Sequence, residues 1–171
     1  MIRDIVVYPD KRLKQVSKEV VEFDKELHTL LDDMYETMIH KNGIGLAAIQ
    51  IGVPLQVLLI NLVREEDEKQ HKEDLLEVIN PKILEADGEI VYQEGCLSVP
   101  GYYEDVKRAE HIKVCYHDRD GNEIITQYKD LMAIAFQHEL DHLKGTLFIE
   151  KLSFLKRKKF EKEWKKKHKK K

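Results

Sequence analysis

The chain has 171 residues, of which 42% are apolar and 36% charged, and this composition predicts a single globular domain with a highly charged surface. No apolar run approaches the roughly 18 residues that a membrane-spanning helix needs, so we expect no membrane association. The opening residues, 1-MIRDIVVYPDKRL, lack the apolar region of a signal peptide, and two cysteines are too few for a disulfide framework, so we expect a cytoplasmic protein with reduced thiols.

The net charge of −3 is unevenly distributed along the chain. Residues 156–171 contain eleven Lys or Arg and two Glu, so this end carries +9 and the remainder −12. We therefore divide the chain into a domain over residues 1–155 and a basic C-terminal helix or tail over residues 156–171. Such a basic segment predicts a polyanionic partner, and a solvated helix end is the alternative.

The first half of the sequence predicts one helix followed by strands. Asp24 is a suitable N-cap, apolar residues then recur at helical spacing at Leu27, Leu30, Leu31, Met34 and Met38, and Gly43 offers a stop. The segment 43-GIGLAAIQIGVP-54 is apolar and interrupted by glycine. A buried strand is expected at 55–61, a charged surface loop at 64–74, and further strands at 75–80 and 88–93.

The second half predicts a hairpin and two more helices. Residues 111–117 alternate in polarity, Asp120-Gly121 is a strong turn, and residues 123–128 supply the return strand. Asp130 can cap the next helix, which should end near Gly145, and a last helix should start at Ser153. Strands and helices do not alternate as in a parallel α/β fold. We therefore predict a single-domain α+β fold, with antiparallel strands packed around a buried central helix and a C-terminal helix.

The predicted central helix carries 138-HELDH-142, the H-E-x-x-H pattern of metal-dependent hydrolases. Residues four apart lie on one face of a helix, so His138 and His142 can bind one ion. Glu139 would then lie beside a metal-bound water and handle its protons. Catalytic sites usually take three ligands from the protein, so a third ligand is required.

Two sources of that ligand follow from metalloprotease patterns. In H-E-x-x-H-x-x-G-x-x-H, the last histidine would fall at Phe148, which has no lone pair for a metal, so this pattern fails. A glutamate from a following helix is the second source, with Glu161 and Glu163 as candidates. Both lie among lysines, where a solvated ion pair is the alternative role.

Cysteine is the third source. Cys96 follows Gly95 in 94-EGCLSVPG-101, and glycine allows a close backbone approach that would turn the thiol into a cleft. A thiolate bound to a divalent ion loses its proton at neutral pH. Cys115 is a rival, because it shares a strand face with His111 and His117, although ordinary packing also explains those three residues.

Three segments, 43-GIGLAAIQ-50, 94-EGCLS-98 and 138-HELDH-142, resemble in order and spacing the three signature motifs of the bacterial peptide deformylases. The resemblance covers nearly the whole chain and implies that residues 1–155 form the catalytic domain. Members of this family are metal-dependent amide hydrolases. They remove the formyl group from the N-terminal formylmethionine of newly synthesised polypeptides and release formate.

The resemblance implies a role for each motif residue. Cys96, His138 and His142 would hold one divalent ion, expected to be Fe²⁺, with Zn²⁺, Ni²⁺ or Co²⁺ able to replace it. Glu139 would transfer protons, while the Gln50 side chain and the Leu97 backbone N–H would stabilise the oxyanion. The residues implied to contact substrate are Ile44, Gly45, Gly95, Arg108, Leu131, Ile134, Ala135 and His138.

Part of this substrate set also follows from helical geometry. Leu131, Ile134, Ala135 and His138 lie on one helical face, which suits a methionine pocket, although ordinary core packing is the alternative. Arg108 has a salt bridge as its alternative role.

The resemblance also implies the partners of this chain, which are N-formylmethionyl nascent peptides and, through residues 156–171, ribosomal RNA. The chain is expected to be a monomer.

Two other function classes compete with this interpretation. A metallopeptidase that cleaves internal bonds would use Glu161 or Glu163 as its third ligand, and Cys96→Ser would then leave metal binding intact. A nucleic-acid-binding module with a structural zinc would need four protein ligands and would have no open coordination position.

Overall fold

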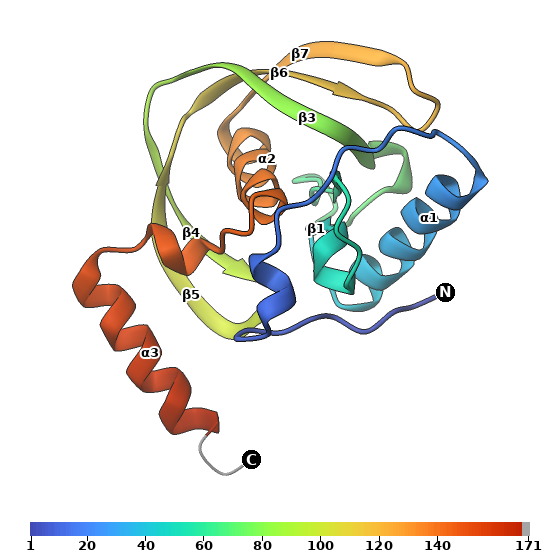
Figure 1. The fold of residues 1–171 in the computed structure, drawn as a ribbon. Helices are drawn as coiled ribbons and strands as arrows, with labels where there is room; N and C mark the ends of the chain where they lie inside the picture. Colours follow the sequence, from blue (N-terminus) through green and yellow to red (C-terminus); the bar gives the residue numbers. More distant parts are fainter. Residues whose placement is uncertain (169–171) are drawn as a thin grey trace.

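A computed structural model describes residues 1–168 of the chain. In it, antiparallel strands form two sheets (Figure 1). The larger sheet has the order β1-β2-β3-β6-β7, and the smaller one pairs β4 with β5. The strands are Gly45–Ala47 (β1), Val57–Ile60 (β2), Leu76–Asp87 (β3), Ile90–Cys96 (β4), Val99–Arg108 (β5), His111–His117 (β6) and Glu123–Lys129 (β7). The predicted antiparallel α+β fold is therefore confirmed, as is the hairpin of β6 and β7.

Helix α2 (Asp130–Leu143) runs through the middle of the molecule, with the long strands β3, β6 and β7 arching over it and β1 beside it (Figure 1). Its buried residues occupy every side of the helix, because it packs against β1, β2 and β7 at once. One apolar cluster joins the helix to β1, β2 and β6 and includes Ala47, Leu58, Val114 and Phe136. The helix that carries H-E-x-x-H is thus buried, as predicted.

Helix α1 (Lys25–His40) packs against β1 and β2 on the face of the sheet opposite α2 and confirms the amphipathic pattern. The Asp24 carboxylate accepts a hydrogen bond from the Leu27 N–H at 3.1 Å, which satisfies one free N–H group at the start of the helix. The predicted apolar residues are all buried. The stop differs from the prediction, because Asn42 and not Gly43 adopts the positive φ, at 59°.

Short 3₁₀ helices connect these elements, at Lys11–Lys14, Ala48–Ile51, Lys72–Asp74 and Phe148–Lys151. Strand β5 was not predicted, since Pro100-Gly101 indicates a turn and a two-stranded ribbon exposes most of its polar residues. The predicted Asp130 cap is wrong. Lys129 occupies the N-cap position and makes no side-chain capping bond, while Asp130 is the first helical residue.

Helix α3 (Phe154–His168) packs against the outside of the β4–β5 ribbon (Figure 1). Phe160 is fully buried, with its ring centroid 5.4 Å from that of Tyr8 and 4.5 Å from that of Tyr102. The boundary expected after Leu155 therefore falls inside a helix that is docked on the core. The last residues of the predicted basic tail, 169–171, lie outside the described residues. No helix in residues 1–168 is long and apolar enough to span a bilayer.

Candidate metal centre

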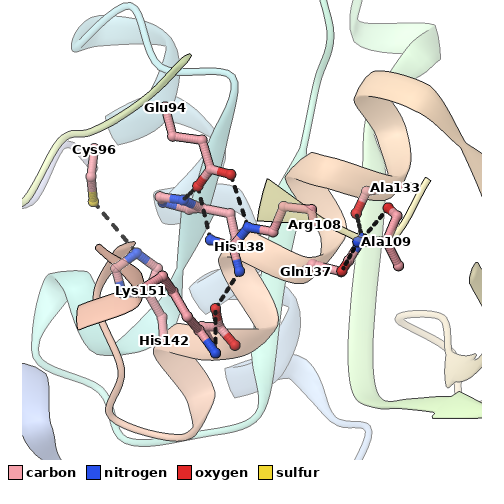
Figure 2. A network of polar contacts seen from close by, with 10 residues as sticks. Glu94, Cys96, Arg108, Ala109, Ala133, Gln137, His138, His142 and Lys151 are labelled. Carbon is pink, nitrogen blue, oxygen red and sulfur yellow. Dashed lines mark hydrogen bonds and ion pairs between the residues drawn. The ribbon is translucent and has the colours of Figure 1, made fainter. Parts of the chain in front are cut away.

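Two histidines of α2 face the end of β4 in the buried part of the molecule. His138 and His142 are one helical turn apart, and the His142 Nε2 atom lies 3.4 Å from the Cys96 Sγ atom (Figure 2). One side-chain atom from each of Cys96, His138 and His142 lies within 4.8 Å of the other two. Among residues 1–168 these are the only His, Cys, Asp or Glu side chains grouped closely enough to hold a metal ion.

The rival ligands lie elsewhere. Glu161 belongs to α3 and pairs with Arg157 at 3.5 Å, on the outside of the molecule. His111 is half-exposed and lies 3.8 Å from the Asp87 carboxylate. Neither residue joins a metal-binding group within the described part of the chain. The geometry therefore favours Cys96 as the third ligand over these alternatives.

A buried ionic network orients His138. The His138 Nδ1 atom donates to the Glu94 carboxylate at 2.8 Å, and Arg108 donates to both Glu94 oxygens at 2.8 Å (Figure 2). Burial favours the neutral form of Glu94, but Arg108 and His138 outweigh it and lower the pKa of this carboxyl to about 2. Arg108 also donates to Asp141 at 2.5 Å. Because Nδ1 is engaged in this way, His138 presents Nε2 to the metal position.

Gln50 is fixed beside the thiol by hydrogen bonds at both ends of its amide. Its Oε1 atom accepts from the Ala47 N–H at 2.9 Å, which determines the orientation of the amide group. The Nε2 atom lies 3.0 Å from the Ser98 Oγ and 3.4 Å from the Cys96 Sγ. A donor therefore points toward the position that a metal and its substrate would share.

Glu139 is buried beside these ligands and pressed against Gly45. A Cβ atom at Gly45 would overlap the Glu139 carboxylate, so a larger residue fits there only if the carboxylate moves. Within the described residues, the Glu139 Oε1 and His142 Nδ1 atoms are buried without a hydrogen-bond partner. Burial raises the pKa of Glu139 to about 7. A carboxyl with that pKa is suited to exchanging protons near neutral pH.

The electrostatics of the two histidines fit a cation between them. Burial lowers the pKa of His142 well below its ordinary value, which keeps the imidazole neutral as a metal ligand must be. Burial acts in the same direction on His138, but the negative charges of Glu139, Cys96 and Glu94 outweigh it and raise the pKa of His138 well above its ordinary value. A divalent ion would compensate the same concentration of negative charge. The residues present therefore fit a metal ion.

A cavity of about 880 Å³ opens onto this group. Its walls include nearly all of the predicted substrate and catalytic residues, namely Ile44, Gly45, Gln50, Gly95, Cys96, Leu97, Leu131, Ile134, Ala135, His138 and Glu139. Two residues are exceptions: the metal-ligand candidate His142 does not line the cavity, and Arg108 pairs with Glu94 on the other side of His138 and takes the salt-bridge role. The sequence analysis missed Tyr92 and Tyr103 on the cavity wall, and it missed Glu94, whose position at the start of the EGCLS motif was the available signal.

The site combines two imidazoles and one thiol with a neighbouring buried carboxyl, and it faces a cavity. This combination defines a class of protein, the metal-dependent hydrolases with H-E-x-x-H on a helix. The family model described as polypeptide deformylase matches residues 2–158. The chain belongs to this family.

Individual relatives agree with the family assignment. The peptide deformylase of Helicobacter pylori (strain G27) is 59% identical over 162 residues, which cover 95% of this chain and 92% of that protein. A crystal structure of a peptide deformylase from Legionella pneumophila matches with a TM-score of 0.88 and 42% identity, covering 97% of this chain and 95% of the other. The peptide deformylase of Ehrlichia chaffeensis in complex with actinonin gives a TM-score of 0.87 at 42% identity and covers 98% of each chain.

Proposed function

We propose that this chain deformylates N-formylmethionyl nascent peptides at the Cys96, His138 and His142 group. The observation that carries the proposal is that these three ligand atoms lie within 4.8 Å of one another, and that Cys96 and His138 line the same cavity as the buried Glu139. The proposed ion is Fe²⁺, with Zn²⁺, Ni²⁺ or Co²⁺ able to replace it, because a Cys-His-His set suits several divalent ions. When bound, the ion supplies a Lewis acid and lowers the pKa of coordinated water.

The chain's own residues would supply proton transfer and oxyanion binding. Glu139, with a pKa of about 7, accepts a proton from the attacking water and returns one to the leaving amine. The Gln50 Nε2–H and the Leu97 backbone N–H donate to the oxygen that becomes negative when the formyl carbon turns tetrahedral. The Gln50 amide is held in place beforehand by Ala47, so it needs little reorganisation during the reaction.

Substrate would bind along the cavity wall. Gly45 offers backbone groups at the free edge of β1, Ile44 lies beside it on the cavity wall, and Gly95 faces them from β4. The methionine side chain would enter between Leu131, Ile134, Ala135 and the His138 ring, which line the cavity from one face of α2. Because actinonin forms a complex with the Ehrlichia relative, we expect actinonin to compete with formylated peptides here as well.

The test is formate release from a short formyl-methionyl peptide by protein purified anaerobically with Fe²⁺. Glu139→Gln should lower kcat by about 10²–10⁴ with the metal retained, because only the proton transfer is lost. The control is Glu85→Gln, which makes the same change on an exposed stretch of β3. Glu77 is less suitable because its carboxylate pairs with Arg119. Absence of formate release from folded, metal-loaded wild-type protein would refute the proposal.

We further propose an accessory contact between α3 and ribosomal RNA. It is supported by the basic composition of residues 156–171 and by the exposure of Lys162, Lys165 and Lys166. Removing the helix would expose the surface that Phe160 buries, so replacing those three lysines by Ala is the better test. Binding to ribosomes should weaken and its salt dependence should decrease. Replacing the exposed Lys25, Lys82 and Lys129 is the control, and equal binding by both variants would refute the contact.

Location in the cytoplasm and a monomeric state remain predictions from the sequence.

A further inference from the structure

The charged segment 64–74, expected to be a surface loop, sends one side chain inward. The Gln70 Nε2 atom donates to the Gly43 carbonyl at 2.9 Å and to the Asn61 carbonyl at 2.7 Å. Gly43 precedes β1 and lines the cavity, while Asn61 directly follows β2. One amide group therefore ties together the backbone at the start of β1 and at the end of β2.

The loop is braced so that Gln70 is held in this position. Arg64 closes its base by donating to Asp74 at 2.6 Å and to Glu73 at 2.7 Å, and His71 contacts the Asp67 carboxylate at 2.7 Å. The Asn61 side-chain amide donates to the His71 carbonyl at 2.9 Å, so the two segments are joined in both directions. Individually the exposed ion pairs contribute little, but together they restrict the geometry of the loop.

The backbone that Gln70 holds belongs to the edge of the sheet nearest the metal position. The Asn61 N–H donates to the Ile44 carbonyl at 2.8 Å, and in an antiparallel pair successive residues face opposite sides. The Gly45 N–H and carbonyl therefore point away from β2, toward the free edge of β1. Gly45 lines the cavity and lies against Glu139, so a displacement of this edge would move the peptide relative to the proton-transfer group.

We propose that Gln70 is a positioning residue, which fixes the Gly43–Gly45 edge of β1 so that the backbone of a formylated peptide can pair with it. This inference rests on the proposed function. Gln70 does not line the cavity and touches no substrate. Its contribution is to hold the Gly43 and Asn61 carbonyls at a fixed separation. This lowers the entropic cost of ordering the edge of β1 when a peptide binds.

The test compares Gln70→Glu and Gln70→Ala with wild type. The glutamate has the same length but offers a carboxylate where two carbonyls need a donor, so it should be at least as damaging as alanine. KM for formyl-Met-Ala-Ser should rise about three- to tenfold while kcat changes little, because a lost hydrogen bond affects binding of the ground state and the transition state alike. The increase should be smaller for formyl-Met, which has no backbone beyond the methionine. Gln127→Ala, an exposed glutamine on β7, is the control.

An unchanged KM for the tripeptide, or an equal loss on both substrates with a lower kcat, would overturn the positioning role. Hydrogen exchange without substrate gives a second, independent measurement. The amides of Leu46 and Asn61, which face the partner strand across the β1–β2 pair, should exchange faster in Gln70→Ala than in wild type, and wild-type exchange rates there would refute the inference. Hydrogen exchange does not depend on turnover, so it tests the role of Gln70 even if the wild-type protein releases no formate. Absence of formate release would count against the proposed function alone.

Discussion

At the scale of single residues, Glu94 shows how a side chain outside the proposed ligand set orients one of the proposed ligands, His138. Its carboxylate holds the His138 Nδ1–H and compensates the Arg108 guanidinium, and both side chains of this ion pair are 4% exposed. Glu94→Gln should lower metal affinity about 10- to 100-fold, because it leaves Arg108 without its full counter-charge and His138 with a weaker acceptor. Competition with a chelator measures this, with Glu85→Gln as control. Wild-type affinity in Glu94→Gln would contradict the orienting role.

Gly45 carries a second residue-scale prediction. A Cβ here would overlap the Glu139 carboxylate, and the carboxylate can escape only by moving from its place beside the ligands. Gly45→Ala should therefore reduce kcat/KM by about 100-fold with little change in metal content, as expected when a reacting group is displaced by about 1 Å. Gly88→Ala, remote from the cavity and at a φ of 72°, is the comparison variant: its cost falls on stability alone, so it should leave kcat/KM of the folded protein unchanged. Activity close to wild type in Gly45→Ala would show that Glu139 does not need this position.

The sequence could predict that His138 and His142 lie together because their spacing is local, and the structure brings Cys96 within 4.8 Å of them. Two histidines four apart on a helix determine their own relative geometry. Arg108 and Glu94 could not be assigned in the same way, since their roles depend on a contact across β4 and β5, and β5 itself was missed. The Pro-Gly pair and the polar residues of that ribbon carry no strand periodicity. Tertiary pairing, and not local preference, makes this segment a strand.

At the scale of elements, the end of α2 depends on Gly145. Its φ is +76°, and a Cβ would overlap the Lys14 backbone carbonyl, which belongs to the 3₁₀ helix packed across the end of α2. Gly145→Ala should destabilise the fold by about 1–3 kcal/mol, because backbone atoms cannot rotate away as a side chain can. The corresponding decrease in melting temperature is about 2–4 °C per kcal/mol.

Gly121→Ala is the matched variant for that measurement. Gly121 also has a positive φ, 85°, but its Cβ would meet only the Phe23 ring at 3.4 Å. The two variants therefore share the left-handed strain and differ in the backbone overlap. An equal loss of stability in both would mean that the packing of α2 against the first 3₁₀ helix is looser than described.

At the scale of the whole molecule, α3 completes the packing around the β4–β5 ribbon. Its many lysines left a solvated helix end open as one interpretation of the sequence, yet Phe160 and Trp164 join a cluster with Tyr8 and Tyr102. Two aromatic residues spaced four apart are enough to dock a helix whose remaining surface is basic. The helix therefore couples the C-terminal segment to β5, whose residues Val99 and Tyr103 line the cavity.

Helix α3 also supplies its own matched pair of substitutions. Phe160 is fully buried, whereas Phe154 in the first turn is 72% exposed. Phe160→Ala should lower the free energy of unfolding by about 3–5 kcal/mol through the cavity it leaves, and Phe154→Ala should change it by less than about 0.5 kcal/mol. Urea denaturation measures both. If the two substitutions have similar small effects, α3 is not part of the cooperative core, and the division of the chain after Leu155 would describe its stability better than a single docked domain does.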